Sequence, residues 1–292
     1  MGFLYFRMVK SDIKSIAVAG AGTMGAGIAE VMARAGYAVL LFDISADMLH
    51  KANEGISGSL QSQVDKGKLT ATEKDAILLH IALTTDVNEL QCDLLIEAIV
   101  EKLEVKQQFF KAVAAINPQD TILASNTSSI PITRIAAGIP NPERFLGIHF
   151  FNPAPVMKLV EIISGVETDP AVVTLCKNLI EKTGKTCVNA ADAPGFIVNR
   201  VARHYYVEGL KLAEEQVADI STIDALMENN GFKMGPFRLM DLIGVDTNFA
   251  VTSSMFALFH QDAKFRPSRI QQQKVDAGHH GRKSGKGFYT YE

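Results

Sequence analysis

Residues 16–28 read IAVAGAGTMGAGI, and this stretch decides the fold. An apolar run over residues 16–19 is followed by glycines at positions 20, 22 and 25. Apolar residues then recur at helical spacing from Met24 to Ala35, and Gly36 stands where a helix would end. The order strand, glycine turn, helix is the context that a GxGxxG pattern needs. We therefore predict an α/β fold with a Rossmann-type, doubly wound sheet.

The glycine turn is suited to a dinucleotide. Gly20 would make the tight turn, Gly22 would let the backbone approach a pyrophosphate, and Gly25 would let the helix pack on the strand. A second apolar run, residues 37–42, ends in Asp43, the expected acceptor for a ribose 2′-hydroxyl; no adjacent Arg could hold a 2′-phosphate, which favours NAD over NADP. The alternative is a glycine-rich turn in another α/β domain. The candidate cofactor contacts in the turn are Gly20, Gly22, Thr23, Met24 and Gly25.

Composition excludes several function classes. The 292 residues are 47% hydrophobic with a net charge of −3, so nothing favours a nucleic-acid or membrane-surface partner. No apolar run approaches the roughly 20 residues that span a bilayer. The three cysteines show no metal-ligand spacing and fit a reducing compartment, so we expect a cytoplasmic protein without a metal site. Residues 1–12 look like an extension ahead of the first strand rather than a signal peptide.

A helical hairpin is expected after Asp43. Ser45 is a candidate N-cap, an apolar stripe runs from Leu49 to Val64, and Gly67 interrupts it. Thr70 and Glu73 have the spacing of a capping box for a second helix. The polar face is either a solvated helix surface or a contact to an anionic ligand; it carries Lys51, Ser59, Lys66 and Lys68.

Further buried strands are predicted at residues 81–85, 94–100 and 121–125. The strand predicted at residues 121–125 is followed by the polar segment Asn126-Thr127-Ser128-Ser129-Ile130-Pro131. Ligands in open α/β sheets bind beyond the carboxyl ends of strands, so these polar groups are candidate ligand contacts. They could equally do no more than cap a helix over residues 131–137.

A histidine and a glutamate form a candidate catalytic pair. His149 ends one apolar strand, and Glu161 lies in the middle of the next apolar run, residues 159–163. A carboxylate among β-forming apolar residues is costly to bury without a partner, and the 12-residue separation suits adjacent strands joined by a turn. A carboxylate beside an imidazole is the arrangement of a general base. The alternatives are a structural buried pair and an edge-strand Glu that faces water.

Strand patterns stop after Asp192-Ala193-Pro194-Gly195-Phe196. A long helix containing Asn199 follows, and further helices are expected near residues 221–230, 237–243 and 245–259. We therefore expect two domains, a dinucleotide-binding domain over residues 1–192 and an all-α domain over residues 193–292.

Five segments in this order resemble the L-3-hydroxyacyl-CoA dehydrogenase family, in particular its stand-alone bacterial 3-hydroxybutyryl-CoA members. They are Gly20–Gly25 with Asp43; Ser125–Ser129; His149-Phe150-Phe151-Asn152-Pro153 with Glu161; Pro194–Arg200; and Gly281–Tyr289. The resemblance covers residues 13 to 292. It implies reversible, NAD-dependent oxidation of a (3S)-3-hydroxyacyl-CoA to the 3-oxoacyl-CoA, and the match is best to short-chain enzymes.

The resemblance also assigns roles. It implies that His149 takes the 3-hydroxyl proton, that Glu161 orients it and stabilises the imidazolium, and that Asn199 binds the thioester or the 3-oxygen. Ser128 would contact both substrate and nicotinamide. The remaining cofactor contacts would be Glu101, Lys106, Asn126, Asn152 and Lys283. Ser59 and Lys66, or Lys68 in its place, would meet the CoA nucleotide, and the helical domain would bind substrate and form a homodimer.

Two other functions fit part of this pattern. A related hydroxyacid dehydrogenase of similar two-domain build would act on a free acid or a sugar acid. Such enzymes usually rely on a catalytic lysine, and the His149–Glu161 pair argues against this alternative. A non-catalytic, crystallin-like NAD-binding protein would share the fold without the chemistry. The joint presence of His149, Glu161, Asn199 and Ser128 favours the enzyme.

Overall fold

The structure, a computed structural model, describes residues 12–292, so nearly all of the expected N-terminal extension lies outside the described residues. The chain divides between Ala193 and Pro194 into two compact units, which are described separately below.

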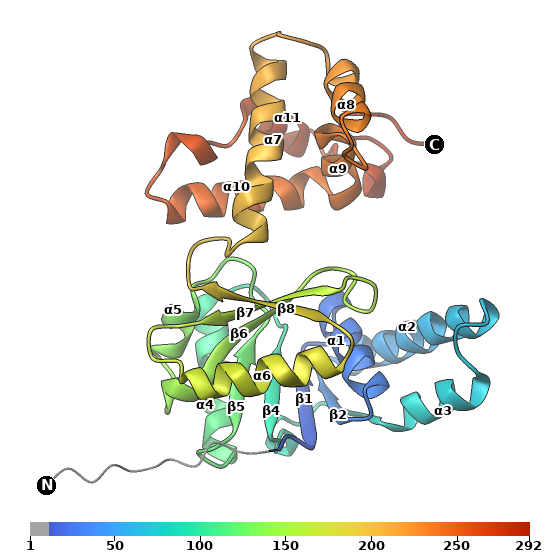
Figure 1. Cartoon of the computed structure of the whole chain (residues 1–292), viewed down its shortest axis with the longest axis vertical. Coiled ribbons are helices and arrows are strands. Elements are labelled where there is room, and N and C mark those ends of the chain that lie inside the picture. Colours follow the sequence, from blue (N-terminus) through green and yellow to red (C-terminus); the bar gives the residue numbers. More distant parts are fainter. Residues whose placement is uncertain (1–11) are drawn as a thin grey trace, which may run out of the picture. The chain divides into compact units, whose positions relative to one another are not determined.

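The first unit is built on one sheet of eight strands in the order β3-β2-β1-β4-β5-β6-β7-β8 (Figure 1). The strands are β1 (Ser15–Ala19), β2 (Ala38–Phe42), β3 (Ile81–Thr84), β4 (Leu94–Glu97), β5 (Ile122–Ser125), β6 (Phe145–Phe150), β7 (Leu159–Ser164) and β8 (Thr186–Ala191). Strands β1 to β6 pair in parallel, β7 runs antiparallel to β6, and β8 is parallel to β7. The order 3-2-1-4-5-6 is that of a doubly wound Rossmann sheet, which confirms the predicted fold class.

Helices cover the sheet. They are α1 (Thr23–Arg34), α2 (Ala46–Asp65), α3 (Ala71–Leu79), α4 (Leu103–Ile116), α5 (Ile132–Ala136) and α6 (Pro170–Lys182). Their apolar stripes meet the strands in one core, in which Ile28 and Met32 of α1 pack with Leu94, Ile96 and the neighbouring strand residues. In Figure 1, α6 lies across one face of the sheet, and the α2–α3 hairpin extends to the side beside β2.

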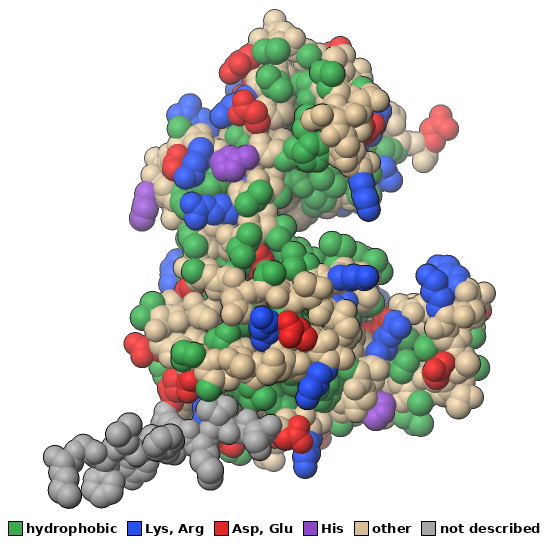
Figure 2. Space-filling view, in the orientation of Figure 1, with side chains coloured by type: hydrophobic (Ala, Val, Ile, Leu, Met, Phe, Trp, Pro, Cys, Tyr) green, Lys and Arg blue, Asp and Glu red, His purple; other side chains and the backbone are tan. Residues whose placement is uncertain are grey.

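The hairpin forms as its sequence signals predict. The Ser45 hydroxyl accepts a hydrogen bond from the backbone N–H of Met48, which caps α2. Thr70 and Glu73 form the reciprocal capping box at the start of α3. Lys66 and Lys68 are exposed in the turn between the helices, and basic side chains gather at the far end of the hairpin in Figure 2.

One predicted boundary is wrong. The strand expected over residues 94–100 ends at Glu97. The buried Glu97 carboxylate accepts a hydrogen bond from the backbone N–H of Ile99, two residues on, and this local bond turns the chain out of the sheet.

The second unit is helical, as expected. Its helices are α7 (Val198–Glu214), α8 (Ile220–Asn229), α9 (Pro236–Ile243), α10 (Val245–Leu258) and α11 (Arg269–Asp276). Tyr206 and Leu210 of α7 pack with Ile223, Phe237 and Met240 to form its core. The sequence patterns did not predict α11. Among the described residues, no helix is long and apolar enough to cross a membrane.

Candidate active site

The glycine turn lies between β1 and α1, and its shape depends on two glycines. Gly20 has a φ of +97°, and a Cβ added there would run into the carbonyl of Ala98. A Cβ on Gly25 would overlap the carbonyl of Gly20. Only hydrogen fits at either position, so α1 approaches β1 closely, with Gly22 as N-cap and Thr23 and Met24 in its first turn. This turn borders a pocket that Ala21, Gly22 and Thr23 help to line.

Asp43 lies directly after β2 and faces this turn. Its Oδ2 accepts a hydrogen bond from the backbone N–H of Ala21 (2.8 Å), and its Oδ1 accepts one from Ser45 (3.0 Å). The carboxylate therefore joins the glycine turn to the start of the hairpin. A carboxylate oxygen has further lone pairs, so the same group can also accept from a ribose hydroxyl.

A buried lysine lies among acidic side chains at the end of β4. Lys106 of α4 is 1% exposed and forms ion pairs with Glu97 and, at 3.2 Å, with Glu101. Burial raises the pKa of the Glu97 carboxyl although Lys106 opposes the shift. Burial also acts to raise the pKa of Glu101, but Lys106 and the hydroxyls of Thr127 and Ser129 outweigh it and hold that pKa below its usual value.

Glu101 also shapes the polar loop after β5. Its Oε1 accepts hydrogen bonds from the Thr127 hydroxyl, from the Ser129 hydroxyl and from the backbone N–H of Ser128 (3.2 Å). The predicted residues Glu101, Lys106 and Ser128 are therefore brought together in one network. Asn126 is tied to the neighbouring strand, because its Oδ1 accepts from the backbone N–H of Phe150.

The alternative that these polar residues cap α5 is wrong. The N-cap position of α5 is Pro131, which offers no side-chain cap. The Asp192 carboxylate instead accepts hydrogen bonds from the backbone N–H groups of Ile132 and Thr133, both at 2.8 Å. The Ser128 loop is thus not needed to complete the helix that follows it.

His149 and Glu161 form the expected pair. They lie opposite each other in the antiparallel β6–β7 ladder, and His149 Nδ1 is 2.7 Å from Glu161 Oε2. Both are buried, with exposures of 5% and 0%, and the edge-strand alternative is therefore wrong. The ring of Phe151 packs against the imidazole with 4.6 Å between ring centroids. Asn152, exposed, is the second residue after β6. Glu161 fixes the ring so that Nε2 points away from the carboxylate, which is the geometry of an oriented base.

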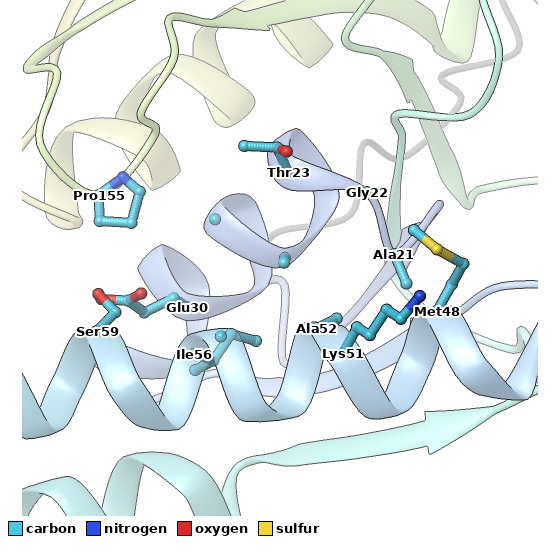
Figure 3. Close-up of a pocket in the computed structure, with 13 residues that line it drawn as sticks. Ala21, Gly22, Thr23, Glu30, Met48, Lys51, Ala52, Ile56, Ser59 and Pro155 are labelled. Atoms are coloured by element: carbon cyan, nitrogen blue, oxygen red, sulfur yellow. The ribbon is translucent and has the colours of Figure 1, made fainter. Parts of the chain in front are cut away.

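A pocket of about 380 Å³ lies between α1 and α2, closed on one side by Pro155 (Figure 3). Ser59 and Glu30 lie next to each other at one end of it, and Lys51 lines it from α2 with its tip beside Met48 and Ala21. The pocket is lined by Ser59 but not by Lys66, which lies at the C-terminal end of α2. The structure therefore places one of the two predicted CoA contacts in this pocket.

Two predicted residues lie in the helical unit. Asn199 is the second residue of α7 and is partly buried. Lys283 forms an ion pair with Asp246 at 2.7 Å. Within residues 12–292, no three His, Cys, Asp or Glu side chains come together as a metal site.

Sequence reasoning missed several buried polar residues. Glu97 appeared only as a strand residue, although an acid next to buried Leu94–Ile96 signals a partner. Glu30 and Arg203 gave no such signal, because polar residues at single positions of amphipathic helices are usually exposed. Both are buried, with exposures of 1% and 3%.

Comparison with known proteins identifies the family. Residues 15–193 match the family model "3-hydroxyacyl-CoA dehydrogenase, NAD binding domain", and residues 195–291 match "3-hydroxyacyl-CoA dehydrogenase, C-terminal domain". The chain belongs to the 3-hydroxyacyl-CoA dehydrogenase family. The resemblance seen in the sequence and the expectation of an NAD site are thereby confirmed.

Relatives within the 3-hydroxyacyl-CoA dehydrogenase family differ in length. The chain is 52% identical to the 3-hydroxyadipyl-CoA dehydrogenase of Escherichia coli over 96% of its own residues, but spans only 59% of that relative. It is 43% identical to the 3-hydroxybutyryl-CoA dehydrogenase of Bradyrhizobium diazoefficiens, of which it covers 96%. The crystal structure of (S)-3-hydroxybutyryl-CoA dehydrogenase from Ralstonia eutropha matches with a TM-score of 0.93 at 37% identity, covering 96% of this chain and all of that one.

Proposed function

We propose that this protein oxidises short-chain (3S)-3-hydroxyacyl-CoA thioesters to 3-oxoacyl-CoA with NAD, reversibly. The observation that carries the proposal is the buried His149–Glu161 pair, held across a ladder in the same unit as the dinucleotide turn. The names of relatives, which include 3-hydroxybutyryl-CoA and 3-hydroxyadipyl-CoA dehydrogenases, support the substrate class.

In the proposed reaction, His149 Nε2 takes the proton of the 3-hydroxyl as the C3–O bond becomes a carbonyl. NAD supplies the hydride acceptor for the hydrogen on C3. Glu161 holds the ring and stabilises the imidazolium without itself taking the proton. Asn199 and Ser128 donate hydrogen bonds to substrate oxygens. These hydrogen bonds become stronger as water is excluded from the site.

The cofactor contacts are proposed on the geometry above. The glycine turn would hold the pyrophosphate and Asp43 the ribose. The Glu101–Lys106 network would fix the loop that carries Asn126 and Ser128 beside the nicotinamide, with Asn152 and Lys283 as further contacts. Ser59 and Lys66 would contact CoA, whose phosphates give a lysine an electrostatic role.

We further propose that residues 1–192 bind NAD, and that residues 193–292 bind the acyl group and form a homodimer. Exposed apolar side chains of the helical unit support self-association: Val201, Leu226, Phe232, Leu242 and Ile243. None of the three cysteines forms a disulfide, which supports a cytoplasmic location.

The test is NADH oxidation with acetoacetyl-CoA, run beside NADPH and beside longer 3-oxoacyl-CoA substrates. We expect turnover with NADH and much less with NADPH, because Asp43 would repel a 2′-phosphate. If NADH binds but no acyl-CoA is turned over, the dehydrogenase proposal fails and the non-catalytic binding role takes its place. Turnover of free hydroxyacids alone would identify the related hydroxyacid dehydrogenases.

A further inference from the structure

The first unit contains a second, smaller pocket of about 200 Å³, which we call the cationic pocket. Pro155 lines both this pocket and the larger one between α1 and α2. Among the described residues that line the cationic pocket, three are basic and none is acidic: Arg34 at the end of α1, Lys158 directly before β7 and Lys185 directly before β8. The space suits one end of a ligand, because whole drug-sized ligands occupy about 300–1,000 Å³.

Two of the three cations are held in place by hydrogen bonds. Lys185 Nζ donates to the carbonyls of Ala154 (2.6 Å) and Met157 (2.8 Å). An ammonium group has three N–H donors, so one remains for a ligand. Arg34 Nη1 donates to Gln63 Oε1 at 2.9 Å, and the guanidinium has further N–H groups to offer. The cations are therefore positioned before a ligand arrives, which lowers the entropy cost of binding.

The positive charge of the cationic pocket is only partly neutralised. Glu30 Oε1 lies 3.5 Å from Arg34 Nη1. Within residues 12–292, no Asp or Glu forms an ion pair with Lys158 or Lys185. Burial and then Arg34 lower the pKa of Lys185, and burial raises the pKa of Glu30. Three cations beside one carboxylate favour an anion with more than one charge, and a phosphomonoester carries about −1.5 to −2 at pH 7.

The cationic pocket continues a path that begins in the larger pocket. In Figure 3, Ser59, Glu30 and Pro155 lie at the same end of the larger pocket. Glu30 is hydrogen-bonded to Ser59 and also pairs with Arg34, so Ser59 and Arg34 share a neighbour. In the proposed function Ser59 contacts CoA. A CoA nucleotide beside Ser59 therefore has the cationic pocket next to it.

We propose that Arg34, Lys158 and Lys185 bind the 3′-phosphate of CoA and thereby select CoA thioesters over thioesters that lack this phosphate. The inference rests on the proposed function and adds a phosphate site to it. CoA carries a single phosphomonoester, at the 3′ position, and the charge of this group matches the cationic pocket. The planar guanidinium can bind two phosphate oxygens at once, while the two lysines act as point charges.

The experiment compares acetoacetyl-CoA with acetoacetyl-3′-dephospho-CoA in the full-length protein with NADH. We expect the KM of the wild type to be about 10- to 150-fold higher for the dephospho substrate, the range for hydrogen bonds to a charged group. The kcat should change by less than about twofold, because a contact made equally in the ground state and the transition state alters KM alone. Added KCl should narrow the KM ratio, because it screens the partly exposed cations.

Two variants test the residues. Lys158→Gln and Arg34→Gln should each reduce the KM ratio by about threefold or more, by raising the KM for acetoacetyl-CoA and not that for the dephospho substrate. Lys158 is exposed, so its replacement should not disturb folding. Lys185 is left in place because its hydrogen bonds also hold the loop before β7. Lys182→Gln removes an exposed charge at the end of α6, beside a different pocket, and should leave the KM ratio unchanged.

Two inhibitors distinguish CoA from free phosphate as the source of the bound group. Adenosine 3′,5′-bisphosphate should compete with acetoacetyl-CoA, and more weakly so in Lys158→Gln. Inorganic phosphate at the same concentration should inhibit far less, because it lacks the nucleotide that occupies the larger pocket. Equal inhibition by the two compounds would overturn the inference, since the cationic pocket would then be a site for free phosphate.

The outcomes separate the two proposals. A wild type that reduces both acetoacetyl thioesters with the same KM overturns the inference and leaves the proposed function intact. A KM ratio that survives in both Lys158→Gln and Arg34→Gln also overturns it, because the 3′-phosphate then binds elsewhere. If neither thioester is reduced, the proposed function itself has failed.

Discussion

Two buried acidic residues of the sheet find basic partners on neighbouring elements. Glu161 meets His149 across an antiparallel ladder, and Glu97 at the end of β4 meets Lys106 on the next helix. The first pair could be predicted, because a single acid in an apolar strand needs a partner and a strand 12 residues earlier ends in His. The buried hydrogen bond between Asn248 and Gln271 could not, because the two residues lie on separate helices, 23 residues apart.

Removing the base should stop the chemistry and spare cofactor binding. We predict that His149→Gln and Glu161→Gln each lower kcat by about 100-fold or more, since a general base contributes about 10²–10⁴-fold and its carboxylate holds it in the correct orientation. Affinity for NADH, measured by fluorescence titration, should change by less than about twofold. His50→Gln, on the exposed face of α2, is the matched control. Near-normal turnover in both variants would contradict the assignment.

Glu30 should make stability depend on pH. Burial raises its pKa above 4.5, against the opposing effects of Ser59 and Arg34. The folded protein then holds this proton more tightly than the unfolded chain does, so the contribution is present below about pH 4.5 and is lost as the pH rises through the raised pKa. Glu30→Gln cannot lose a proton, and its stability relative to the wild type should increase over that range.

Urea unfolding from about pH 4.5 to about pH 8 measures this difference. Glu54→Gln, which replaces an exposed carboxylate on α2, is the control and should follow the wild-type pH profile. Parallel curves for Glu30→Gln and wild type would show that the buried carboxyl does not carry the pH dependence.

Among the elements, capping signals predicted the α2–α3 hairpin well, because Ser45 and the Thr70–Glu73 box act within a few residues. The helix α11 was missed because it is largely polar; Ile270 and Val275 are its apolar residues. The contacts of the C-terminal segment were missed too, because they are made to a residue nearly 50 positions earlier. Asp241, 1% exposed, accepts hydrogen bonds from the backbone N–H groups of Phe288 and Tyr289 and from the Tyr291 hydroxyl.

Asp241 should therefore hold the C-terminal segment on the helical unit. We predict that Asp241→Ala lowers the free energy of unfolding by about 3 kcal/mol, because it leaves three donors without their acceptor. The segment should also become sensitive to limited proteolysis after Arg282 or Lys283. Asp276→Ala, which removes an exposed carboxylate bonded only to the Gln272 side chain, should cost less than about 0.5 kcal/mol. Equal losses in both variants would contradict this role for Asp241.

For the whole molecule, self-association through the helical unit is the main open prediction. Leu242 and Ile243, at the end of α9, are 49% and 44% exposed. We expect a homodimer in sedimentation equilibrium, and we expect Leu242→Lys to shift it toward monomer, because a buried lysine without a partner costs several kcal/mol.

Leu79→Lys is the matched control for this prediction. Leu79 is 88% exposed on α3, in the other unit, and its replacement should leave the dimer intact. A wild type that sediments as a monomer, or a Leu242→Lys variant that remains dimeric, would show that this surface is not the interface.

The β6–β7 ladder limits where insertions and deletions in this chain can be tolerated. Side chains alternate between the two faces of a strand, so one residue inserted between Leu159 and Glu161 would turn the carboxylate away from His149 and reverse every later position of β7. We therefore expect homologues to show no insertions or deletions within β7, however freely they substitute its apolar residues.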